Sequence, residues 1–177
     1  MDWIAASVIV STIGIIVTIV IASRATNKEL RHNRFLQERD IAIRLLHENE
    51  FESEWIAAKH ALFEKLIFET EFDWKNFSSR KFSPKNELDS EEKIFGHQVT
   101  MVLNHLEFIS VAILTGAANE EIVKAQIKKQ ITLAFNRLQP YIEEARRVID
   151  DQNVYCNLET VAKNWMGGKD IAMKLKF

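Results

Sequence analysis

The sequence predicts an all-α protein, with one N-terminal transmembrane helix followed by a cytoplasmic helical bundle of about five helices. Three observations carry this prediction. Residues 3–22, WIAASVIVSTIGIIVTIVIA, contain no charged side chain, and a helix of about 20 residues crosses the roughly 30 Å hydrocarbon core of a bilayer. The body of the chain repeats apolar residues at helical spacing and lacks strongly β-patterned segments. Only five Gly and two Pro occur among 177 residues, so few positions would break a helix.

The uncharged segment is predicted to stay in the protein as an anchor. A cleaved signal peptide begins with positive charge and has an apolar run of about 7–15 residues, whereas only Met1 and Asp2 precede this longer run. Basic residues follow the segment and none precedes it, which predicts an N-terminus outside and a domain in the cytoplasm. We therefore expect a single-pass protein of the inner (cytoplasmic) membrane. The basic residues are Arg24, Lys28, Arg31 and Arg34.

One face of the predicted transmembrane helix carries small residues at steps of three and four. In lipid, such a face lets two helix backbones approach closely, and Ser or Thr hydroxyls can hydrogen-bond across the contact. The face is a candidate for self-association. The alternative is a chance stripe, because small residues are common in any spanning helix. Its members are Ser7, Ser11, Gly14, Thr18 and Ala22.

We predict four segments: a transmembrane helix over 1–23, a juxtamembrane helix continuous with it over 24–47, a helical bundle over 48–166 and a tail over 167–177. Basic residues exceed acidic ones in the juxtamembrane helix. This excess suits anionic lipid headgroups, although membrane topology alone would also explain it. The formal net charge of the chain is −2, so composition gives no general argument for nucleic-acid binding. The single cysteine, Cys156, cannot form an internal disulfide.

The first helix of the bundle is predicted from its cap and its apolar stripe. Asn49 followed by Glu52 has the form of a capping box, in which each side chain satisfies a backbone N–H of the first turn. The helix then runs to about Glu69. Apolar residues recur at steps of three and four and predict a core-facing side, made of Phe51, Trp55, Ala58, Leu62 and Leu66.

The segment from Thr70 to Ser90 is predicted to be the main loop between helices, because it combines Ser-Pro, paired Ser, Asn and Asp. Its aromatic and basic residues interleave, which suits a membrane interface or the grip on a partner. The alternative is a lid that folds back and uses the same aromatics internally. These residues are Phe72, Trp74, Lys75, Phe77, Arg80, Lys81 and Phe82.

Asp89 and Glu92 form a second predicted capping box, opening the most apolar cytoplasmic helix, 90–115. Gly116 is placed to end this helix in the left-handed conformation. Asn119 is the predicted cap of the next helix.

That helix runs to about Leu138, and Pro140 then predicts either a kink or a break. A last helix is expected over 154–165. The tail after Gly168 alternates apolar and polar residues, which suits either the edge of a partner's sheet or a loosely packed end.

No residue pattern identifies a reaction. The chain has no Gly-rich phosphate loop, no nucleophile elbow, no paired cysteine motif and no His-x-x-x-His spacing, so no catalytic, cofactor-binding or metal-binding residue is predicted.

One polar cluster is predicted to be buried, because Asn104 and Glu107 interrupt the most apolar helix and need partners on later helices. Its structural interpretation is an ion pair of Glu107 with a later arginine, such as Arg137, that fixes helix register. The functional interpretation makes Glu107 a general base or a ligand contact. The predicted cluster consists of Asn104, Glu107, Arg146 and Arg147.

Several of these features together resemble a bacterial family known only as a domain of unknown function. They are the N-terminal span, the segment VLNHLEFISVAILTGAANEEIV (102–123), the Arg146-Arg147 pair and the terminal NLETVAKNW. The resemblance covers most of residues 1–165 and is most specific around Asn104, Glu107 and Gly116, and at Trp165. It implies a small, membrane-anchored, helical protein and supplies no activity.

The sequence therefore predicts a non-enzymatic, membrane-anchored interaction or scaffold protein that forms homo-oligomers. The alternative is an oligomeric membrane effector, of a phage-defence or stress type, that acts through its transmembrane helix; a hydrolytic enzyme ranks third. Expected partners are membrane lipid, a second copy of the chain and another protein, with no nucleic acid and no cofactor.

Overall fold

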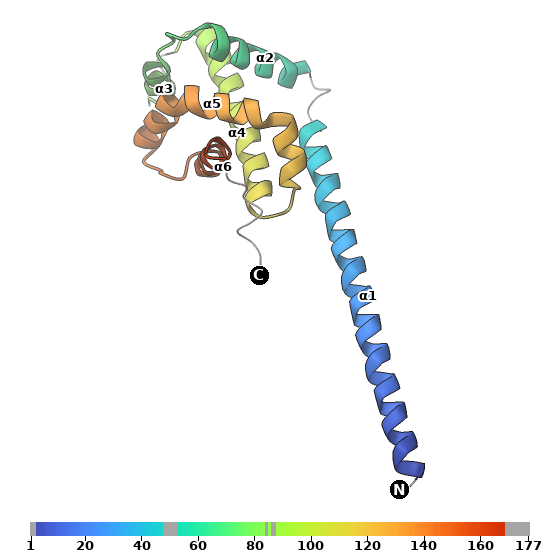
Figure 1. Ribbon diagram of the computed structural model, residues 1–177. Helices are drawn as coiled ribbons and strands as arrows, with labels where there is room; N and C mark the ends of the chain where they lie inside the picture. The colour runs from blue at the N-terminus through green and yellow to red at the C-terminus, as the bar shows by residue number, and fades with distance from the viewer. Residues whose placement is uncertain (1–2, 48–52, 84, 86–87, 169–177) are drawn as a thin grey trace. The chain divides into compact units, whose positions relative to one another are not determined.

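The computed structural model describes residues 3–47, 53–83, 85 and 88–168, and for residues 3–19 it describes the backbone alone. All regular secondary structure in this described part is α-helix (Figure 1), which confirms the predicted all-α class. The helices are α1 (Trp3–His47), α2 (Ser53–Phe68), α3 (Trp74–Phe82), α4 (Ser90–Leu114), α5 (Glu120–Ile149) and α6 (Cys156–Met166).

The predicted membrane span is corrected by the structure. Among the described residues, none of the helices has both the length and the apolar character needed to cross a membrane. Where the side chains of α1 are described, from Val20 onward, the helix carries charges such as Arg24 and Lys28 at short intervals, and a charge inside a bilayer is costly. The predictions of a transmembrane helix over 1–23 and of a single-pass location in the inner membrane are therefore wrong.

Contacts divide the chain into two compact units, Met1–Gln37 and Glu38–Phe177. The first unit is the N-terminal part of α1. The second contains α2 to α6 together with the last turns of α1, where Ala42 and Leu45 are buried. The backbone N–H of Asn119 donates to the carbonyl of Glu38 at 3.1 Å and ties these last turns to the start of α5. The compact unit thus begins ahead of residue 48, where the bundle is predicted to start.

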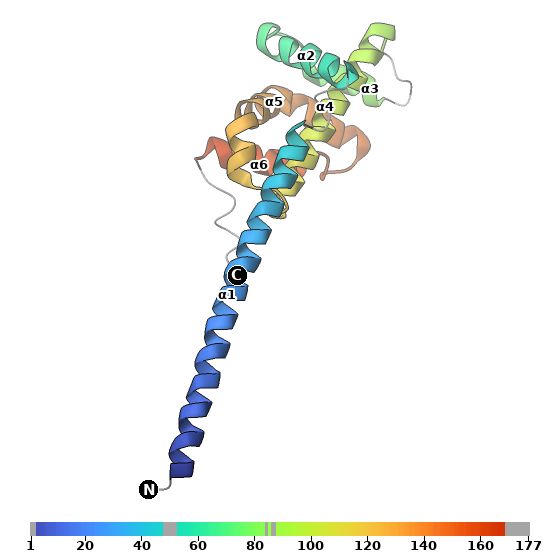
Figure 2. The same cartoon turned by 90° about the vertical axis from the view of Figure 1, so that its right-hand side faces the viewer.

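The helices of the second unit surround one apolar core. α2 packs on α4, α3 packs on α5, and α6 packs against both α4 and α5. In the two views of Figures 1 and 2, α2 lies at the outer edge of this unit and α6 lies beneath α5. Each large aliphatic side chain buried here contributes about 1.5–3 kcal/mol relative to an exposed one. Fully buried members of the core include Leu62, Leu103, Ile131, Leu138 and Trp165.

The caps predicted for α4 and α5 are present. Asp89 accepts from the backbone N–H of Glu92 at 2.9 Å, and Glu92 accepts in return from the N–H of Asp89 at 3.2 Å. Asn119 accepts from the N–H of Ile122 at 3.1 Å, and Gly116 has the predicted left-handed conformation with φ of 69°. Each of these contacts satisfies a backbone group that a helix end leaves without an intrahelical partner.

Two expectations for the later helices differ from the structure. Of the kink and the break that were the two alternatives predicted from Pro140, the break is wrong, because α5 continues through Pro140 to Ile149. The segment predicted as a loop between Thr70 and Ser90 contains α3, whose N-cap is Asp73. The predicted Asn49–Glu52 cap and the tail from residue 169 lie outside the described residues.

Candidate interaction site

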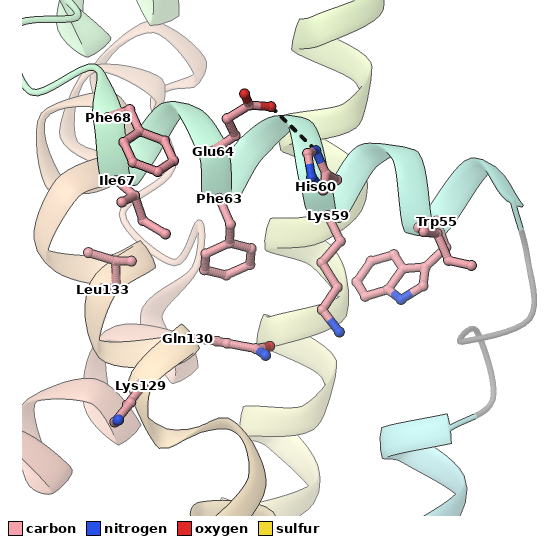
Figure 3. A pocket seen from close by; sticks show the side chains of 11 residues that line it. Trp55, Lys59, His60, Phe63, Glu64, Ile67, Phe68, Lys129, Gln130 and Leu133 are labelled. Atoms are coloured by element: carbon pink, nitrogen blue, oxygen red, sulfur yellow. Dashed lines mark ion pairs between the residues drawn. The ribbon is translucent and has the colours of Figure 1, made fainter.

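A groove of about 830 Å³ opens between α2 and α5 (Figure 3). Most of its wall comes from α2, and three residues of α5 close the other side. The lining is chiefly apolar, with lysines from both helices. We call it the α2–α5 groove; it is lined by Trp55, Ile56, Lys59, His60, Phe63, Glu64, Ile67 and Phe68 of α2, and by Lys129, Gln130 and Leu133 of α5.

The groove exists because α2 is apolar on two sides. Its inner side follows the predicted stripe, and Trp55, Ala58, Leu62 and Leu66 are all buried in the core. A second apolar row lies outside this stripe and is only partly covered by the described residues. Ile56 is 51% exposed, Ile67 is 52% exposed and Phe68, at the end of α2, is 77% exposed. A surface helix normally carries polar residues opposite its buried face, so α2 departs from the usual pattern.

The charges of the α2–α5 groove are divided between its two flanks. In Figure 3, Lys59 points from α2 toward the side of Gln130, and Glu64 points away on the opposite side of α2. Lys129 supplies a second ammonium group from α5. His60 Nδ1 lies 3.3 Å from Glu64 Oε2, within one exposed turn of α2, where water screens the pair and limits its contribution to a fraction of a kcal/mol.

A smaller cavity of about 30 Å³ lies behind the groove, between α2, α4 and α5. It shares Trp55, Lys59, Phe63 and Gln130 with the groove. The indole of Trp55 and the imidazole of His105 meet edge to face there, with ring centroids 4.5 Å apart. This contact orients the inner wall of the groove and joins α2 to α4.

The predicted polar cluster is divided by the structure between two places. Glu107 on α4 reaches the first turn of α6, where its carboxylate accepts from the backbone N–H of Leu158 at 2.7 Å and from that of Asn157 at 3.2 Å. The side-chain amide of Asn157 donates to the same carboxylate at 2.7 Å. The N-cap residue of α6, Tyr155, makes no side-chain cap bond, so Glu107 caps this helix from outside it. Its described hydrogen bonds therefore fit a structural role.

Asn104 and Tyr155 continue this junction between α4 and α6. The Tyr155 hydroxyl donates to Asn104 Oδ1 at 3.2 Å. Burial, and secondarily the negative charge of Glu107, raise the pKa of the Tyr155 phenol to about 12. The phenol therefore stays neutral and keeps its donor at neutral pH.

The two arginines of the predicted cluster bind other partners. Arg146 donates to Glu159 at 2.8 Å and to the carbonyl of Val154 at 2.9 Å, joining α5 to the start of α6. Lys163 first, and then Arg146, hold the pKa of the Glu159 carboxyl below its usual value. Arg147 forms two hydrogen bonds with Glu144, one turn earlier on α5, at 2.6 and 3.0 Å. The structure thus brings Asn104 and Glu107 to one end of α6 and Arg146 close to it, with Arg147 paired separately.

The aromatic-basic segment that was predicted as a partner or membrane-interface loop is largely part of the core. Trp74 and Phe77 of α3 are buried, and Phe72 and Phe82 are half-buried. Their rings pack against Phe95 and Tyr141, as the lid alternative expects.

The basic residues of this segment differ in their exposure. Lys75 is exposed, whereas Arg80 is half-buried and donates to Glu92 at 2.8 Å. Lys81 is also half-buried and donates to three neutral oxygens, the carbonyl of Gly96, Thr100 Oγ1 and Tyr141 Oη. The described side chains of this segment therefore offer little apolar surface to a partner.

The predicted association face lies mostly outside the residues whose side chains are described. Ser7, Ser11, Gly14 and Thr18 fall in that part of α1, and Ala22 is exposed. The described residues also contain no group of three or more His, Cys, Asp or Glu side chains placed to hold a metal ion.

The outer row of α2 escaped the sequence interpretation, although a signal for it exists. Ile56, His60, Phe63 and Ile67 are spaced by four, three and four residues, a second helical stripe beside the one assigned to the core. When two apolar stripes share a short helix, the core can cover only one of them.

These observations define the class of the protein: an all-helical chain with a compact unit that leaves an apolar groove exposed. The chain belongs to the family described as a domain of unknown function, DUF4760, whose model matches residues 5–165. This match agrees with the resemblance to a family of unknown function; the membrane anchoring and bacterial origin implied by that resemblance do not follow from it. The comparison with curated proteins and the comparison with solved structures each gave no match.

Proposed function

We propose that the compact helical unit is a non-enzymatic interaction or scaffold module that binds another polypeptide in the α2–α5 groove. The observation that carries the proposal is the exposure of Ile56, Ile67 and Phe68 around one groove. Single exposed apolar residues are ordinary, but a group of them beside a concave surface is typical of a protein interaction site. The membrane effector expected as the alternative depended on the transmembrane helix and is not proposed.

The groove suits a helix with one apolar face. Ile56, Phe63 and Ile67 recur at the spacing that a helix in a groove presents to its partner. Lys59 and Lys129 on the two walls favour acidic side chains beside the apolar face of that partner. Because apolar groups form most of the lining, desolvation of the groove supplies the binding energy and the lysines supply orientation.

Site-specific photocrosslinking in living cells tests this proposal. A photoreactive benzoylphenylalanine replaces Phe68 in the full chain, since Phe68 lines the groove and is mostly exposed. The matched control carries the same group at Ile149, which is 48% exposed on α5 and does not line the groove. We expect discrete protein adducts from position 68 and not from position 149, lost when Ile67→Asp is added. Absence of adducts at position 68, or equal adducts at both positions, would contradict the proposal.

A further inference from the structure

We propose that the polypeptide bound at the α2–α5 groove is α2 of a second copy of this chain, with the two α2 helices parallel and in register. This inference rests on the proposed function and adds to it the identity and orientation of the partner. The pairing follows from the order of apolar and charged residues around α2. The side chains of all these residues are described.

The outer row of α2 follows a heptad. With Ile56 and Phe63 at d positions, His60 and Ile67 fall at a positions, which together form the seam of a two-stranded helix pair. Lys59 then occupies a g position and Glu64 an e position, on opposite flanks of the seam. Figure 3 shows these two side chains pointing to opposite sides of α2, as the heptad requires.

The charges decide between parallel and antiparallel pairing. In a parallel pair, a residue at g of one helix meets the following e residue of the other, so Lys59 meets Glu64 of the second copy, twice by symmetry. In an antiparallel pair the two g flanks meet each other and the two e flanks meet each other, so Lys59 of one copy does not reach Glu64 of the other. Only the parallel pair makes these two attractions, so the charge pattern favours it.

The wall of the groove that α5 forms also favours parallel pairing. The g flank of α2 is the flank that faces α5, because Lys59 points toward the side of Gln130. A second copy of α2 in the groove would place its e flank against this wall, so its Glu64 would approach Lys59 and also Lys129 of α5. Each copy therefore offers ammonium groups where the other offers a carboxylate, and both copies use the same surface, as an isologous dimer requires.

The polar residue in the seam has a matching role. A polar side chain at an a position weakens a helix pair but fixes its register, because any other alignment would place it against an apolar residue. His60 holds that position, between Ile56 and Ile67. In the in-register pair the two His60 rings face each other and leave the Ile and Phe layers unbroken.

The first test measures the dimer dissociation constant of the full chain by sedimentation equilibrium at low salt. Lys59→Glu or Glu64→Lys each replaces two attractions by two repulsions, and we expect each to weaken dimerisation about tenfold. The double variant restores opposite charges and is expected to return to within about threefold of the parent. Ile67→Asp is expected to abolish the dimer, whereas Ile149→Asp leaves it unchanged.

Orientation is tested by disulfide formation. In the parallel pair, the two copies of residue 56 lie beside the symmetry axis, within the Cα separation of about 4.4–6.8 Å that a disulfide spans. Ile56→Cys alone is expected to give a covalent dimer under mild oxidation, and the parent chain, which contains only Cys156, is the control. An antiparallel pair would cross-link only when Ile56→Cys and Ile67→Cys are both present.

Three results would overturn the inference. They are a parent chain that stays monomeric, a self-association unaffected by Ile67→Asp, and charge variants whose double combination does not recover. The proposed function is judged separately by the mass of the adduct at position 68. Adducts with a different protein would reject the second copy and keep the interaction module, whereas no adduct would reject both. Circular dichroism confirms folding of each variant, and Glu64→Lys, at an exposed position, serves if Lys59→Glu disturbs the fold.

Discussion

Replacing Lys81 with Met is expected to change the pH dependence of stability. The ammonium group lies between α3, α4 and α5, where it donates to the Gly96 carbonyl, Thr100 and Tyr141. Burial lowers the pKa of this lysine from 10.5 to about 8 in the folded protein. The cause is the loss of hydration of the charged form, which three neutral acceptors replace only in part.

The direction in which stability changes with pH depends on whether the folded or the unfolded chain holds the proton on Lys81. Between about pH 8 and pH 10.5, the unfolded chain keeps a proton on Lys81 that the folded chain has released, so the stability of the parent rises with pH in this window. The full shift corresponds to about 3 kcal/mol, of which about 1 kcal/mol of stability is regained between pH 7 and pH 9. Lys81→Met lacks the titrating group, so its stability does not rise with pH in this way.

Urea unfolding of the parent and of Lys81→Met at pH 7 and pH 9 measures the effect. We expect the unfolding free energy of the parent, relative to the variant, to increase by about 1 kcal/mol between the two pH values. Lys75→Met, an exposed position on the same helix, is the control and should show no such change. A difference between parent and Lys81→Met that is constant with pH, or that decreases as pH rises, would refute the reasoning.

Four further substitutions test contacts of the compact unit. Glu107→Gln removes the charge that caps α6 and is expected to lower the unfolding free energy by about 1–3 kcal/mol; an unchanged melting temperature would show that this cap is dispensable. Trp165→Phe removes the 2.8 Å bond from the indole N–H to the buried Glu120 and should cost about 1–3 kcal/mol in urea unfolding; an unchanged free energy of unfolding would show that this bond does not stabilise the unit. Leu62→Ala should cost about 2–5 kcal/mol and Ile56→Ala less than about 0.5 kcal/mol; equal costs would mean that the outer side of α2 is covered within one chain.

Local patterns in the sequence predict most helices correctly. Caps depend on a few neighbouring residues, which is why Asp89, Asn119 and Gly116 could be assigned before any tertiary structure was known. α3 was missed because Ser, Asn and Pro residues indicate turns. However, Trp74, Phe77 and Ser78 are spaced as on one side of a helix and are all buried.

The candidate site depends on contacts between residues far apart in the chain, and these were harder to predict. The sequence indicated that Glu107 needs a partner, and an arginine was the natural expectation. The partner is instead the backbone of α6, whose first turn has N–H groups without an intrahelical acceptor. Every helix has such groups, so the residue types of α6 do not single it out as the partner. The groove escaped prediction for a related reason, since only the packed structure shows which of the two stripes on α2 faces the core.

The cap of α6 also bears on how this unit unfolds. A helix that carries its own N-cap can separate from its neighbours and keep its first turn, whereas α6 loses the Glu107 acceptor as soon as it moves away from α4. An isolated helix of 11 residues is marginal in water even with good caps. Detachment and melting of α6 are therefore one event, and α6 shares the cooperative transition of the core instead of fraying ahead of it.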